Sequence, residues 1–166
     1  MTEIAYVALG SNLGDRRAYL QNGLADLNAV PDTEVDEVSS LYETPPIGPP
    51  DQSNYFNAVC SLTTSLPPND LLLAMQKIEG KSHRQRTIHW GPRTLDLDLL
   101  LYGTLQIATQ ELTLPHLHMH ERCFVLTPLC EIAPHLTHPT TNKPFATYHH
   151  ELTCTSQVKK VGSLTP

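Results

Sequence analysis

The chain has 166 residues, enough for one domain with its own hydrophobic core, and 40% of them are hydrophobic and 17% charged, as in folded globular proteins. The formal net charge of −6 argues against the basic face with which proteins hold long nucleic acids, but leaves small anionic ligands open. No stretch reaches the roughly twenty apolar residues of a membrane span, and residues 1–10 lack the basic start of a signal peptide.

The cysteines form no CxxC pair, and a chain of this size does not depend on disulfides for its stability. We therefore expect reduced thiols at Cys60, Cys123, Cys130 and Cys154. Reduced thiols and the lack of a leader indicate a cytoplasmic protein, which we expect to be a monomer.

Apolar periodicity predicts the order strand, helix, strand, strand, helix, strand. The strands are expected at residues 4–9, 35–42, 55–62 and 94–102. The helices are expected around residues 20–27, capped by Ser11 or Asn12, and over residues 69–80. This order predicts a split βαβ arrangement of the α+β class, a small sheet with two helices packed on one face.

Between and beyond these elements the pattern is weaker. Residues 44–53 are expected to form a stiff loop, because prolines lack the backbone donor that regular structure needs. A hairpin is expected over residues 105–114 and a short helix over residues 122–131. Residues 140–166 form a tail with no readable pattern, and the whole of residues 1–166 is treated as a single domain.

Two carboxylates, Asp96 and Asp98, interrupt the most apolar of the predicted strands. The period of two along a strand places both on one face. Oxygen ligands that face one way suit Mg²⁺, which takes one or two carboxylates and completes its shell with water and substrate phosphates. The alternative is a solvated sheet face that carries two ordinary aspartates.

Three arginines, Arg84, Arg86 and Arg93, precede the aspartates within a few positions. Guanidinium groups bind phosphate oxygens through paired donors. Alone the arginines would indicate a basic surface loop, but beside the carboxylates they match polyphosphate transfer by positioning and charge neutralisation. The chain has neither a GxxxxGK[ST] loop nor protein-kinase signatures, so a bound nucleotide requires another fold.

Aromatic and histidine side chains supply weaker signals. Tyr55 and Phe124 could stack on a flat heterocycle whose polar edge is read by Asn57, although each could equally be a core residue. Three alternating histidines could share a face as zinc ligands, but a polar edge is the simpler interpretation. They are His116, His118 and His120.

At Arg84-Gln85-Arg86 and Trp90-Gly91-Pro92-Arg93-Thr94-Leu95-Asp96-Leu97-Asp98 the chain resembles the 6-hydroxymethyl-7,8-dihydropterin pyrophosphokinase family. The resemblance covers residues 4–140. Its other motifs are Gly10-Ser11-Asn12-Leu13-Gly14, Ser40-Leu41-Tyr42-Glu43-Thr44-Pro45-Pro46-Ile47-Gly48, Tyr55-Phe56-Asn57-Ala58, Pro115-His116 and Arg122-Cys123-Phe124.

The resemblance implies a ferredoxin-like α+β fold and the transfer of pyrophosphate from ATP to the hydroxymethyl group of 6-hydroxymethyl-7,8-dihydropterin. The products would be AMP and the pterin diphosphate, in folate biosynthesis, with two Mg²⁺ ions accompanying ATP. Nucleic acid and membrane would not be partners.

The resemblance also implies roles for individual residues. Asp96 and Asp98 would hold the metal ions and act in catalysis with Arg84 and Arg93. The pterin contacts would be Thr44, Pro45, Ile47, Tyr55, Asn57 and Phe124. The ATP contacts would be Gln76, Glu79, Arg84, Arg86, Trp90, Arg93, His116 and Arg122.

ATP binding is where the chain departs from the family pattern. Leu117 stands where some members carry an aromatic residue, and the segment between Arg86 and Trp90 is shorter than in some relatives. Two other functions stay open at this point: a non-catalytic ferredoxin-like module that binds nucleotide or RNA, and a metal-dependent nucleotide hydrolase.

Overall fold

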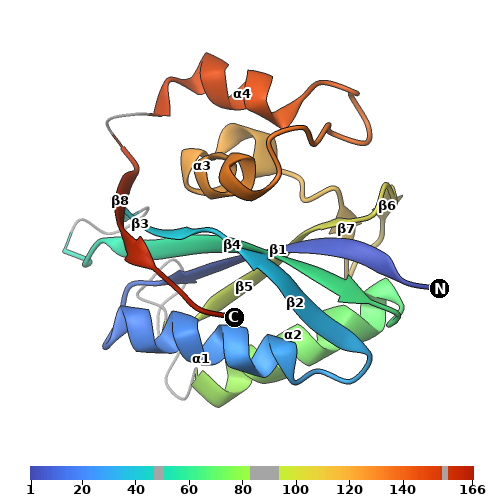
Figure 1. Ribbon diagram of the computed structural model, residues 1–166, viewed down its shortest axis with the longest axis horizontal. Coiled ribbons are helices and arrows are strands. Elements are labelled where there is room, and N and C mark those ends of the chain that lie inside the picture. The colour runs from blue at the N-terminus through green and yellow to red at the C-terminus, as the bar shows by residue number, and fades with distance from the viewer. Residues whose placement is uncertain (47–50, 83–93, 155–156) are drawn as a thin grey trace.

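The computed structural model describes residues 1–46, 51–82, 94–154 and 157–166, and its centre is one six-stranded sheet (Figure 1). The strand order is β5-β1-β4-β3-β8, with β2 also paired to β4, and every pairing is antiparallel. The strands are β1 (Glu3–Ser11), β2 (Thr33–Val38), β3 (Ser40–Thr44), β4 (Tyr55–Thr64), β5 (Asp96–Tyr102) and β8 (Lys159–Ser163). A separate hairpin joins β6 (Ile107–Ala108) to β7 (Thr113–Leu114).

Helices lie on both faces of this sheet (Figure 1). On one face are α1 (Arg16–Asn28) and α2 (Pro68–Ser82), which satisfy the prediction of two helices packed together on a small sheet. On the other face are α3 (Cys123–Ile132) and α4 (Phe145–Leu152), with the short 3₁₀ helix η1 (Met119–Glu121) before α3. A short helix was expected over residues 122–131, where α3 lies, but α4 and the packing of a helical layer on this face were not predicted, because residues 140–166 carry no readable pattern.

The alternation along β4 explains why two layers can pack on one sheet. Ala58, Cys60 and Leu62 lie in the core under α1 and α2, while Val59 lies in the opposite core with Leu126 of α3. Successive side chains of a strand point to opposite faces, so a strand buried on both faces needs apolar residues at both parities. The middle of β4 is therefore buried on both faces.

One expected strand is interrupted. Residues 35–42 form two elements, β2 and β3, because Ser39 leaves the regular ladder. Its backbone N–H donates to the Val59 carbonyl at 2.9 Å, and its hydroxyl accepts the Val59 N–H at 3.0 Å. The irregularity redirects the chain so that β3 continues along β4 toward Thr44 and Tyr55.

The cap of α1 also differs from the prediction. Ser11 belongs to β1, and Asp15 caps the helix by accepting the Ala18 N–H at 3.1 Å. The expectation of Ser11 or Asn12 was wrong because the strand runs further than its apolar residues indicate. Asn12 is thereby available for contacts elsewhere.

The tail has defined structure. After α4, strand β8 pairs with β3 and so completes one edge of the sheet. Cys123 and Cys154 form a disulfide with a Cα–Cα distance of 5.4 Å, which corrects the expectation that all four thiols are reduced. The two cysteines are 31 positions apart, and only the packing of α3 against α4 brings them together. Cys60 and Cys130 are free thiols.

None of the helices in the described part of the chain combines the length and apolarity that a membrane crossing requires.

Candidate active site

The two aspartates predicted to share a face do so, at the start of the edge strand β5. Asp96 and Asp98 are half-buried and alternate with Leu97 and Leu99, which are buried under α1 and α2. Asp96 is in register with Gly10 of β1, and Asp98 with Ala8. The carboxylates therefore project from the sheet face that also carries α3, next to small side chains on the neighbouring strand.

Gly10 connects this strand to the predicted aromatic and amide site. It is in register with Asn57 of β4 as well as with Asp96 of β5, so the three residues form a row across the sheet. Neighbouring strands are about 4.8 Å apart, which places the Asp96 and Asn57 backbones about 10 Å from each other on one face. Because glycine has no side chain, Gly10 does not fill the space between the Asp96 carboxylate and the Asn57 amide.

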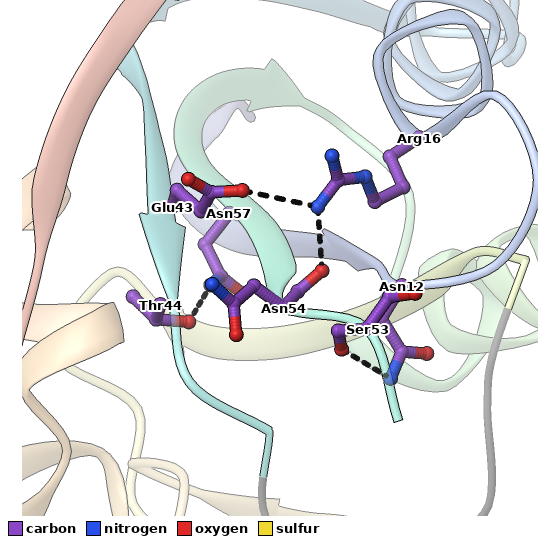
Figure 2. A network of polar contacts seen from close by, with 7 residues as sticks. All are labelled: Asn12, Arg16, Glu43, Thr44, Ser53, Asn54 and Asn57. Carbon is purple, nitrogen blue, oxygen red and sulfur yellow. Dashed lines mark hydrogen bonds and ion pairs between the residues drawn. The ribbon is translucent and has the colours of Figure 1, made fainter. Parts of the chain in front are cut away.

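The Asn57 amide is oriented by a short contact with Thr44 (Figure 2). Its Nδ2 donates to Thr44 Oγ1 at 2.6 Å, and both residues are buried. Its Oδ1 points the other way, toward Gly10, where a Cβ would lie only 3.1 Å from the oxygen. Tyr55 also faces this row, since its Cδ1 would be 3.5 Å from the same Cβ. An acceptor and an aromatic ring thus border the open position above Gly10.

Glu79 supports the aspartate strand from α2. Its Oε2 accepts the backbone N–H of Leu97 at 2.9 Å, midway between Asp96 and Asp98. β5 is an edge strand of the sheet, so this amide depends on a partner outside the ladder. Gln76 lies one turn earlier on the same helix and is exposed.

His116 lies near Asp98, in the segment that follows β7. Its backbone N–H donates to the Leu100 carbonyl at 2.9 Å, beyond Asp98 on β5. Burial lowers the pKa of the imidazole below its ordinary value, while the nearby Asp98 carboxylate opposes that shift and Arg122 reinforces it. The ring lies within electrostatic reach of both Asp98 and Arg122.

Phe124 and Arg122 come from the start of α3, the helix that packs on β4. Phe124 is half-buried at the border of the α3–α4 core, and the Arg122 guanidinium lies 5.6 Å from the centre of its ring. The candidate residues in the described part of the chain therefore lie on or next to β3, β4, β5, β7, α2 and the start of α3, and their assembly into one substrate site stays a prediction. The alternating histidines are not gathered on a strand; His118 and His120 lie in or beside η1.

Several predicted positions lie outside the described residues: Ile47, Arg84, Arg86, Trp90 and Arg93. Pro45 is described and is exposed at the end of β3.

A polar network that was not predicted lies near Thr44 and Asn57, at the β3–β4 end of the row (Figure 2). Asn12 Nδ2 donates to Gln52 Oε1 at 3.0 Å and to the Ser53 carbonyl at 3.2 Å, so the Gly-Ser-Asn-Leu-Gly turn holds the segment before β4. Arg16 binds Glu43 and the Asn54 carbonyl nearby. These residues line a pocket of about 560 Å³. The glycine-rich motif and the segment from Ser40 to Ser53 had been noted in the sequence, but their contact with each other had not been predicted.

The donor set at Asp96 and Asp98 fits Mg²⁺. In the described part of the chain no three His, Cys, Asp or Glu side chains converge on a common metal position. Two half-buried carboxylates on one strand face are the number of protein ligands that Mg²⁺ commonly uses when phosphates complete its shell. Asp96 and Asp98 would hold the ion, which would neutralise charge on bound phosphates.

Comparison with known proteins identifies the arrangement. Residues 6–134 match the family of 7,8-dihydro-6-hydroxymethylpterin-pyrophosphokinase, HPPK. The chain belongs to the HPPK family. It is 48% identical over 132 residues to the 2-amino-4-hydroxy-6-hydroxymethyldihydropteridine pyrophosphokinase of Bacillus subtilis (strain 168), a match that covers 80% of this chain and 79% of the relative. It is 47% identical over 139 residues to the protein of the same name from Pseudomonas aeruginosa, covering 84% and 86%.

The fold of the HPPK family is found in solved structures as well. A crystal structure of an HPPK-DHPS protein in complex with substrates aligns with a TM-score of 0.72 at 14% identity. The alignment covers 90% of this chain but 42% of the solved one, so the chain spans less than half of that protein. At this identity the likeness shows the fold alone, which is the predicted ferredoxin-like α+β fold.

Proposed function

We propose that the row Asp96–Gly10–Asn57 is where this chain performs the reaction of its family. HPPK enzymes are pyrophosphokinases, and the chain transfers pyrophosphate from ATP to the hydroxymethyl group of 6-hydroxymethyl-7,8-dihydropterin in folate biosynthesis. The observation that carries the proposal is the register, which sets two carboxylates and a buried amide on one face with a glycine between them. This spacing accommodates a planar heterocycle on one side and a polyphosphate on the other.

The pterin would lie at the β3–β4 end of the row. Asn57 Nδ2 donates to Thr44 Oγ1, and this fixes the amide so that Oδ1 would accept hydrogen bonds from the donor edge of the ring. Tyr55 and Phe124 would stack on its faces, since aromatic pairs hold flat ligands at low entropic cost. Pro45 and Ile47 would complete this side with the backbone after Thr44.

ATP would lie at the β5 end. Asp96 and Asp98 would hold two Mg²⁺ ions on its phosphates, with Arg84 and Arg93 neutralising charge in catalysis. Glu79 keeps the aspartate strand in place through Leu97. The remaining nucleotide contacts would be Gln76, Glu79, Arg86, Trp90, His116 and Arg122.

The reaction follows from these positions. The hydroxymethyl oxygen attacks the β-phosphorus of ATP, and the bond from that phosphorus to the oxygen bridging the α-phosphate breaks. AMP leaves with the bridging oxygen, the hydroxyl proton is released, and the pterin carries the transferred pyrophosphate. The side chains contribute by aligning attacking oxygen, phosphorus and leaving group, which is the main task in phosphoryl chemistry.

We further propose that residues 1–166 act as one domain, that the protein is a cytoplasmic monomer, and that it binds neither nucleic acid nor membrane. The net charge of −6 supports the absence of nucleic-acid binding. The Cys123–Cys154 disulfide is unusual for a reducing compartment, so the redox state of this pair in cells tests the location directly.

The substitutions Asp96→Asn and Asp98→Asn test the site. Each removes a metal-binding charge and keeps the side-chain shape, so turnover should fall by about a hundredfold or more while unfolding changes little. Asp26→Asn is the matched control, because Asp26 is a partly exposed carboxylate of α1 that pairs with Lys81, outside the site. Full activity in either site variant would contradict the proposed metal position.

A further inference from the structure

Arg16, the first residue of α1, contacts two chain segments that are separated in sequence from it and from each other (Figure 2). Its Nη1 donates to Glu43 Oε2 at 3.2 Å and to the Asn54 carbonyl at 2.7 Å. Its guanidinium carbon also lies 3.8 Å from the centre of the Phe56 ring. None of these partners belongs to the positions that the family resemblance assigns to substrate.

Each contacted residue stands next to a residue of the pterin site. Glu43 directly precedes Thr44 at the end of β3, and Asn54 directly precedes Tyr55 at the start of β4. Thr44 is in register with Tyr55, and Glu43 with Phe56. Arg16 therefore binds both strands at the point where they diverge, one residue before the side chains that face the substrate.

Arg16 acts from the opposite face of the sheet. Phe56 packs against the core under α1 and α2, whereas Asn57 shares the other face with Gly10 and Asp96. Successive side chains of a strand point to opposite faces of the sheet. Arg16, which contacts Glu43 and Phe56, therefore lies on the face opposite to the side chains of Thr44, Tyr55 and Asn57, and it leaves their face open for substrate. The guanidinium is thus placed to set the separation of the two strand ends without touching a ligand.

The contacts require the shape of arginine. The ion pair is partly buried, with 26% of the Arg16 side chain and 30% of the Glu43 side chain exposed. A planar guanidinium can lie over the Phe56 ring while its edge donates to a carboxylate and a carbonyl, and a lysine ammonium lacks this geometry.

We propose that Arg16 is a positioning residue for the pterin: by joining Glu43 to the Asn54 carbonyl it holds Thr44, Tyr55 and Asn57 at the spacing the heterocycle requires. This inference rests on the proposed function of the site. It predicts that loss of Arg16 weakens pterin binding selectively, because the aspartate strand and the nucleotide positions lie at the other end of the row.

The test measures equilibrium binding of 6-hydroxymethyl-7,8-dihydropterin by fluorescence titration, in the presence of Mg²⁺ and a non-hydrolysable ATP analogue. Arg16→Met should raise the dissociation constant of the pterin about tenfold, the effect of losing a charge-assisted hydrogen bond, while that of the ATP analogue changes less than about twofold. Arg16→Lys should recover part of the lost pterin affinity, since lysine restores the positive charge beside Glu43 without the second hydrogen bond, to the Asn54 carbonyl.

Arg17→Met is the matched control. Arg17 is the next residue of the same helix and also donates to a backbone carbonyl, that of Ser163, at 2.9 Å, but this contact lies at β8. Its removal should leave pterin binding unchanged. If Arg16→Met does not fold, Glu43→Gln breaks the same ion pair, keeps the Asn54 contact and should show the same selective loss.

Pterin binding that is unchanged in both Arg16→Met and Glu43→Gln, or lost equally in Arg17→Met, overturns the positioning role. An equal loss of pterin and nucleotide affinity also overturns it, because that is the result of general destabilisation. If the unmodified chain itself binds no pterin, the proposed function fails first and the positioning role falls with it.

Discussion

The hydrogen bond between Asn57 and Thr44 gives a prediction with a defined magnitude. Thr44→Val replaces the hydroxyl by a methyl group of nearly the same size, so packing is preserved while Asn57 Nδ2 loses its acceptor. Thr44 is 5% exposed and Asn57 6%, which means that water cannot easily replace the lost partner. A buried donor left without its partner costs about 1–3 kcal/mol.

We therefore expect Thr44→Val to lower the free energy of unfolding by about 2 kcal/mol, or the melting temperature by about 4–8 °C for a chain of this size. Pterin affinity should fall about tenfold, because the Asn57 amide is no longer fixed with Oδ1 toward Gly10. Urea unfolding and pterin titration measure the two effects. Thr44→Ser retains the hydroxyl and should behave like the unmodified protein; equal behaviour of the valine and serine variants would refute the role of this bond.

Three further changes have expected outcomes. Gly10→Ala places a methyl group 3.1 Å from Asn57 Oδ1 in the floor of the site, so pterin titration should show at least about tenfold weaker binding with little change in melting temperature. Cys154→Ser opens a 31-residue loop and should lower stability by about 3–4 kcal/mol in non-reducing urea unfolding; a midpoint unchanged from the oxidised protein would exclude the disulfide. Burial raises the pKa of Glu131, but hydrogen bonds from Tyr42 and Ser40 outweigh this effect and lower the pKa below its ordinary value of 4.5. The ionised Glu131 therefore stabilises the fold fully above pH 4.5, and this stabilisation is lost as the pH falls through the lower pKa of the folded state. Urea midpoints between pH 3 and 6 should show this loss in the unmodified protein and less of it in Glu131→Gln.

The sequence was most informative where periodicity and chemistry coincide. The alternation of Asp96 and Asp98 with leucines predicted their common face, and the apolar run at residues 55–62 predicted the strand that became β4. These are local properties, because the side-chain direction in a strand depends only on parity. The register that sets Asn57 beside Gly10 is not local and required the fold.

The features that were missed depend on contacts between distant segments. Arg16 meets Glu43 across 27 positions, and no short motif links them. Cys123 and Cys154 were expected to be reduced because the chain has no CxxC pair and is large enough to fold without disulfides. Neither property shows which cysteines lie close together, and the packing of α4 on α3 decides this. The pairing of β8 with β3 was missed for the same reason, since a short exposed edge strand has little apolar pattern.

The central claim is tested most directly by AMP formation from MgATP with 6-hydroxymethyl-7,8-dihydropterin present or omitted. AMP should form only when the pterin is present, in equal amount to pterin diphosphate, and the rate of its formation should fall by about a hundredfold or more in Asp96→Asn. AMP or phosphate released from ATP without the pterin, or no product from folded protein supplied with both substrates and Mg²⁺, would contradict it.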